Sequence, residues 1–188
     1  ISDVMGFKKE NGVKTPCEGK LYYRGINVKK LVKGLMKEDR LGFEETTYLL
    51  LFGKLPNQTQ LDQFVRVLAD YRELPDQFVR DVIMTAPSAN IMNGLQKSVL
   101  TLYSYDASPD DTSLQNVLRQ SLGLIATMPM LSVYSYQAYQ HYYNGKSLVI
   151  RHPKEDLSTA ENILRMMRDD AVYTELEARV LDAALVLH

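Results

Sequence analysis

The residues of this sequence that could perform acid–base or metal chemistry are few and scattered. Its three histidines, His141, His152 and His188, lie far apart in the chain, and none has a neighbour at the spacing of metal ligands. The sequence contains no Gly-rich phosphate loop, no cysteine pair for a metal and no nucleophile-elbow motif. The residue types alone therefore predict no catalytic residue and no metal site in these 188 residues.

Acidic residues occur in three adjacent pairs, which are Glu44 and Glu45, Asp110 and Asp111, and Asp169 and Asp170. Neighbouring residues on a helix point apart. We therefore interpret these pairs as helix caps and solvated surface. The acidic loop 106–111 lacks the alternating carboxylates and central Gly of a calcium loop, so we predict a solvated turn there.

Composition narrows the possible partners and the compartment. The net charge of −1, with both signs interspersed, predicts no binding of nucleic acid or of an anionic membrane. Cys17 is the only cysteine, has no nearby histidine and is interpreted as an unreactive thiol. With one cysteine and no signal segment at the start, a cytoplasmic location is expected.

The stretch from Thr112 to Tyr143 organises the rest of the chain. Its middle, residues 122–134, carries no charge, and a helix that is apolar on all faces must be buried. Polar residues interrupt the run, so a membrane span is disfavoured, and Pro129 predicts one kinked helix. Small residues, among them Ala126, would allow another helix to approach closely. Burial inside one domain and burial against a second subunit both remain open.

The flanking sequence predicts further helices and little strand. Apolar residues at helical spacing indicate helices that begin near Val28, Phe43, Leu61, Phe78 and Ile91. Asn27 can cap the first of these, and Gly53 fits a left-handed C-terminal cap after Phe43–Phe52. Capping boxes at 158–161 and 174–177 start two more helices.

Only residues 21–24 look like a strand, within a small β-hairpin or extended arm near the N-terminus. About eight helices are expected in total, so the fold class is all-α.

Four segments, taken in order, resemble citrate synthases of the bacterial type. They are residues 19–25 (GKLYYRG), 43–56 (FEETTYLLLFGKLP), 160–164 (AENIL) and 181–188 (LDAALVLH). The resemblance implies a multi-helical fold that corresponds to the amino-terminal part of the family's large helical domain. Residues 1–188 would form a single helical unit of that domain, without the small domain and the catalytic segments.

The resemblance also implies a reaction and its substrates. Citrate synthases condense acetyl-CoA with oxaloacetate and water to citrate and CoA in the tricarboxylic acid cycle. They use no cofactor, because acetyl-CoA is a substrate, and they form homodimers through antiparallel helices that the Thr112 to Tyr143 helix resembles. The resemblance thus implies an acyltransferase and a homodimer.

The family's catalytic groups do not match any residue of this chain. The Leu187–His188 pair corresponds to a family motif that is followed by a second histidine, which helps to hold oxaloacetate. The histidine and aspartate that enolise acetyl-CoA come later still. His188 is therefore the one substrate-binding candidate, placed at the wall of the site, no catalytic residue is assigned, and the 188 residues alone are expected to be inactive.

Two alternatives remain open. The first is 2-methylcitrate synthase, which uses propionyl-CoA, because the acyl pocket lies outside this sequence. The second is a non-catalytic helical dimerisation module that keeps the scaffold without the chemistry. Ile1 is not an initiator methionine and His188 follows an apolar run without a stop signal, so both ends are expected to be cuts through a longer chain.

Overall fold

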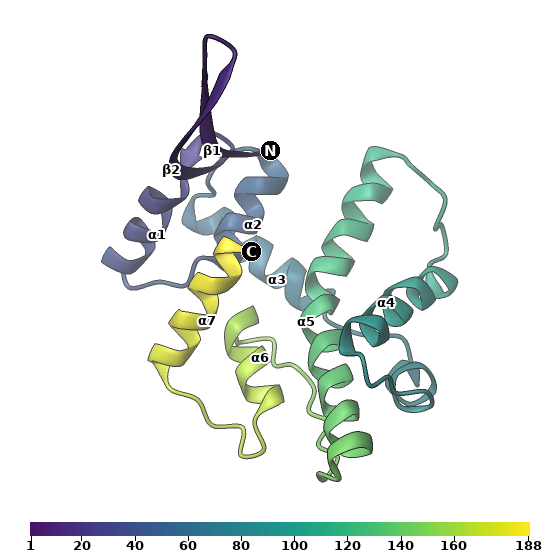
Figure 1. The fold of residues 1–188 in the computed structure, drawn as a ribbon. Coiled ribbons are helices and arrows are strands. Elements are labelled where there is room, and N and C mark those ends of the chain that lie inside the picture. Colours follow the sequence, from purple (N-terminus) through teal and green to yellow (C-terminus); the bar gives the residue numbers. More distant parts are fainter. The chain divides into compact units, whose positions relative to one another are not determined.

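The computed structural model describes residues 1–188, and most of them are helical (Figure 1). The elements in order are β1 (Ser2–Glu10), β2 (Val13–Tyr23), β3 (Ile26–Asn27), α1 (Val28–Lys37), α2 (Phe43–Phe52), α3 (Gln58–Asp70), the π-helix η1 (Val79–Met84), α4 (Ile91–Leu102), the 3-10 helix η2 (Tyr103–Tyr105), α5 (Leu114–Asn144), α6 (Thr159–Met167) and α7 (Glu175–Leu187). The all-α class with a small antiparallel sheet near the N-terminus is confirmed.

The chain forms two compact units. The first contains Ile1–Val65 together with Thr174–His188, and the second contains Arg66–Tyr173. The single helical unit expected over residues 1–188 stays a prediction.

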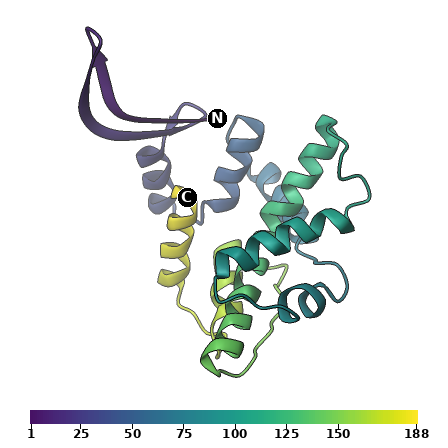
Figure 2. The same cartoon turned by 45° about the vertical axis from the view of Figure 1, so that its right-hand side comes forward.

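The N-terminal hairpin is much longer than the strand predicted at residues 21–24. β1 pairs with β2 from Ser2 opposite Tyr23 to Glu10 opposite Val13, with a register shift between Met5 and Phe7. Asn11 and Gly12 both have positive φ, as a two-residue type I′ turn requires. Gly and Pro residues inside the ribbon weaken the strand pattern in the sequence. The ribbon projects from the helices of its unit (Figure 2).

The first unit has a core between β2, α1, α2 and α7. Tyr23, Leu35, Leu49 and Val186 are among its buried members. Asn27 caps α1 by accepting a hydrogen bond from the Lys29 amide at 2.9 Å, as predicted. α2 ends at Gly53 with φ 79°, which confirms the predicted left-handed cap.

The second unit is built around α5. α4, α6 and η1 contact this helix, and α4 and α6 lie on different sides of it (Figure 1). The core residues that α5 contributes are Met130, Leu131, Val133, Tyr134 and Ala138. Between Ser121 and Gln140, Leu124 is the only exposed residue, so the uncharged middle is largely buried, although not on every face as the sequence predicted.

The two faces of α5 are not equivalent. One face is buried within the unit and carries Leu122, Ala126, Met130, Val133 and Gln137. The other is half-buried in the middle, and its ends expose Leu114, Val117 and Tyr142. Ala126 and Ala138, two of the small residues of α5, are therefore buried.

Pro129 lies within one continuous helix, as predicted, and it leaves the Ile125 carbonyl without its usual amide donor. No helix of the structure is at once long and apolar enough to cross a bilayer.

Candidate functional site

The C-terminal end of α7 carries His188, the one substrate-binding candidate of the sequence, which was expected at the wall of the site. α7 begins at a capping box, in which the Thr174 hydroxyl accepts from the Glu177 amide and the Glu177 carboxylate accepts from the Thr174 amide. This confirms the predicted helix start. His188 is the C-cap, its amide donates to the Leu185 carbonyl at 3.3 Å, and its side chain is exposed.

Asp182 connects α7 to the start of α2. Its Oδ2 accepts from the Gly42 amide at 2.7 Å and its Oδ1 accepts from the Phe43 amide at 3.0 Å. No side chain at the start of α2 caps that helix, so the carboxylate of Asp182 takes this role from α7. The negative charge at a helix N-terminus also suits the helix dipole.

Tyr23 holds the last turn of α7. Its hydroxyl donates to the Val186 carbonyl at 2.9 Å, and the side chain is buried. The hydroxyl of a β2 residue thus binds the backbone of α7 two residues before His188.

The acidic pair at the start of α2 is buried, contrary to the prediction from the sequence. Glu44 and Glu45 are buried, each 6% exposed, whereas the sequence suggested caps and solvated surface. Glu45 forms an ion pair with Arg40, and this hydrogen bond is the main cause that raises the pKa of the Arg40 guanidinium. The two acids are therefore buried in the first turn of α2, while Asp182 accepts from the amides at its start.

The other two histidines lie in the second unit. His141 Nδ1 is 2.8 Å from the Lys146 carbonyl oxygen, at the end of α5. His152 lines an open cavity of about 1010 Å³ together with Arg72, Glu73 and Lys154. Sequence reasoning did not find this cavity, because its walls come from segments far apart in the chain.

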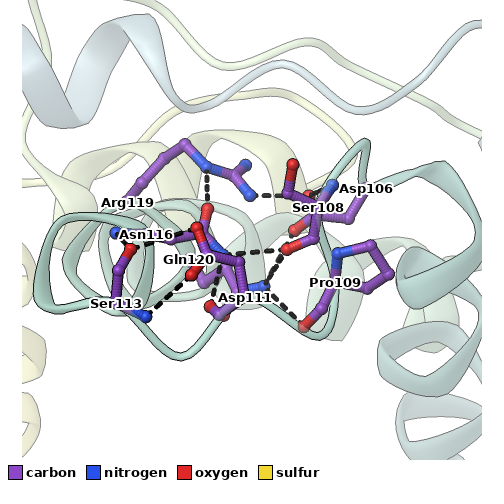
Figure 3. Close-up of polar contacts among 8 residues, drawn as sticks. All are labelled: Asp106, Ser108, Pro109, Asp111, Ser113, Asn116, Arg119 and Gln120. Atoms are coloured by element: carbon purple, nitrogen blue, oxygen red, sulfur yellow. Dashed lines mark hydrogen bonds and ion pairs between the residues drawn. The ribbon is translucent and has the colours of Figure 1, made fainter.

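The acidic loop 106–111 is attached to the first turns of α5 (Figure 3). The Asn116 side-chain amide donates to the Ser108 carbonyl at 2.8 Å and to the Asp111 carbonyl at 2.7 Å. Arg119 donates to Asp106 Oδ1 at 2.6 Å, and Gln120 donates to Asp106 Oδ2 at 3.1 Å. Side chains of α5 thus hold the loop against the first turns of this helix.

Hydrogen bonds to Asp106 also shift its titration. The Ser108 amide is the largest cause that lowers the pKa of this carboxyl, and Arg119 and Gln120 add to it. Asp110 and Asp111 are exposed, as predicted. No group of three or more histidine, cysteine or acidic side chains in the structure is placed to hold a metal ion.

The sequence of residues 2–188 matches the family model described as "Citrate synthase, C-terminal domain". The chain belongs to the citrate synthase family. The resemblance seen in the four ordered segments is thereby confirmed.

Individual members of the family support the same assignment. The chain is 32% identical over 175 residues to a citrate synthase of Haloferax volcanii, which covers 90% of this chain and 42% of that protein. It is 28% identical over 144 residues to a "Citrate/2-methylcitrate synthase" of Bacillus subtilis, which covers 77% of this chain and 37% of that protein.

The fold matches solved citrate synthases. The structure of the enzyme from Pyrobaculum aerophilum superposes with a TM-score of 0.76 at 27% identity, covering all of this chain and 43% of the other. The chain spans less than half the length of the relatives that it matches.

Proposed function

We propose that the protein containing these residues is a citrate synthase that condenses acetyl-CoA with oxaloacetate and water to citrate and CoA. The match of residues 2–188 to the family model is the observation that carries the proposal. In the reaction a base removes a methyl proton from acetyl-CoA, and the resulting carbon attacks the ketone of oxaloacetate. Water then hydrolyses the thioester and releases CoA.

His188 has a supporting role in this proposal. It follows α7, at the position that the resemblance places at the wall of the oxaloacetate site. The groups that remove the methyl proton and stabilise the enolate oxygen are not assigned to any residue of the chain. We accordingly expect residues 1–188 alone to bind no acetyl group productively and to form no citrate.

Thiol release tests the proposal directly. The protein expressed from the complete reading frame is mixed with oxaloacetate and acetyl-CoA, and free CoA is followed with a thiol reagent. We expect release that depends on both substrates. No turnover with either acetyl-CoA or propionyl-CoA would refute an acyltransferase of this family.

A second candidate is 2-methylcitrate synthase. The Bacillus subtilis relative carries both activities in its name. Comparing kcat/KM for acetyl-CoA and propionyl-CoA in the same assay separates the two. One missing methylene in a hydrophobic pocket changes specificity by about 10- to 200-fold, so a clear preference is measurable.

The proposed enzyme is a homodimer in the cytoplasm. α4 exposes Met92 and Leu100, and α5 exposes Leu114 and Val117, all on helices of the second unit. A contiguous exposed apolar patch of a few hundred Å² or more marks a site of protein association. We propose that a second copy of the chain covers them.

A further inference from the structure

α7 presents one buried face to the rest of its unit. Ala178, Asp182 and Val186 follow one another at four-residue spacing, and each is at most 4% exposed. Residues at this spacing lie on one side of a helix. The contacts made by this face therefore decide where the end of the helix, and with it His188, is placed.

Asp182 fixes the helix in two directions at once. Its two carboxylate oxygens accept from two different amides, those of Gly42 and Phe43. A single hydrogen bond would leave a pivot, whereas two bonds to successive amides restrict both rotation and sliding of α7 on α2. Gly42 also lies against Leu35, since a Cβ on Gly42 would overlap the Leu35 side chain.

Tyr23 acts at the last turn. The Tyr23 hydroxyl supplies a donor for the Val186 carbonyl from a buried position in β2. The last turn of α7 is therefore held two residues before His188.

We propose that Asp182 and Tyr23 are positioning residues, which hold the end of α7 so that His188 meets oxaloacetate in a fixed place. This inference rests on the proposed citrate synthase activity. Neither side chain touches substrate in this account, because both are buried. Asp182 is bonded to the amides at the start of α2, and Tyr23 is bonded to a carbonyl of α7. Their effect is transmitted through the backbone of the last two turns.

The test compares three variants of the protein from the complete reading frame. Asp182→Asn puts an amide NH₂ group against one of the two backbone donors, and Tyr23→Phe removes one hydroxyl. Thr174→Ala is the matched control, because it weakens the start of the same helix without touching the end that carries His188. For each variant, kcat, the KM for each substrate and thermal unfolding are measured.

We expect Asp182→Asn and Tyr23→Phe to raise the KM for oxaloacetate by about tenfold, since misplacement by about 1 Å costs up to a factor on the order of 100. The KM for acetyl-CoA should stay at the wild-type value. Thr174→Ala should lower the unfolding temperature while leaving both KM values unchanged. A higher KM for oxaloacetate in the first two variants but not in Thr174→Ala distinguishes positioning of His188 from general stabilisation of α7.

Two results would overturn the inference. One is a wild-type KM for oxaloacetate in the folded Tyr23→Phe protein, which remains informative should Asp182→Asn fail to fold. The other is an equal rise of this KM in Thr174→Ala. A wild-type protein that forms no citrate would refute the proposed function itself, so the two failures are distinguishable.

Discussion

Gly42 shows how one residue without a side chain can hold an interface together. It precedes α2, donates its amide to Asp182, and lies so close to Leu35 that a Cβ would overlap this side chain. Leu35 is 5% exposed and has little room to move. Glycine is needed here because of space, since the φ of Gly42 is −125°.

We predict that Gly42→Ala destabilises the protein by about 1–3 kcal/mol, the usual cost of overpacking a core. Gly34→Ala is the control, because nothing lies within 4 Å of the Cβ that it adds and it sits inside α1. This change should stabilise the helix by about 0.5–1 kcal/mol. Urea unfolding measures both, and equal effects would contradict the packing argument.

The role of Asp182 could not be predicted from the sequence, nor could the burial of Glu44 and Glu45. The partner of Asp182 lies 140 residues away, so no local pattern reveals it. Acidic residues at the start of a helix normally act as exposed partners of the helix dipole. In α2 a distant carboxylate caps the helix, and the local acids are buried.

Local signals predicted the helices well and the hairpin poorly. The capping box at Ser158 and Glu161 is present, with both reciprocal hydrogen bonds formed. It depends on residues three positions apart, so sequence alone suffices. The ribbon of β1 and β2 depends on pairing across a turn, and Pro16 and Gly19 conceal its strand pattern.

At the capping box that starts α6, we predict that Ser158→Ala lowers the free energy of unfolding by about 1 kcal/mol. The hydroxyl accepts from the Glu161 amide at 3.2 Å, and alanine leaves that donor without its partner. Thermal unfolding followed by circular dichroism measures the loss. An unchanged transition would mean that water replaces the cap at no cost.

The loop before α5 should carry a pH-dependent contribution. The folded pKa of Asp106 lies below its ordinary value of 3.8, so its stabilising effect is present at neutral pH and is lost as pH falls through the folded pKa. Asp106→Asn should therefore destabilise the protein at pH 7, and this difference should shrink as the pH falls through the folded pKa of Asp106. Urea unfolding at pH 7 and at a series of acidic pH values checks this. A difference that persists in acid would contradict the assignment.

At the scale of the whole molecule, the exposed apolar residues of α4 and α5 predict association. Leu100 is 75% exposed, and Met36 on α1 is 74% exposed, which makes them a matched pair. A stable dimer buries at least about 1,000 Å². Leu100→Glu should therefore shift the sedimentation of the protein from dimer to monomer, whereas Met36→Glu should not.

Ala126 is one of the small residues that the sequence offered for the approach of another helix, and the structure buries it. Ala126 is 6% exposed on the inner face of α5, so a glutamate there would disrupt the core. The helical pattern indicated that the middle of α5 is apolar on all faces, but it could not say which face its own unit covers. A wild-type protein that sediments as a monomer would contradict the dimer.

The most direct test of the central claim follows the carbon–carbon bond. The protein from the complete reading frame is incubated with oxaloacetate and acetyl-CoA labelled with ¹³C in the methyl group, and the product is examined by NMR. A citrate synthase moves the label into a methylene carbon of citrate and releases one CoA per citrate. Label that stays in acetyl-CoA, or that appears in free acetate, would contradict the assignment.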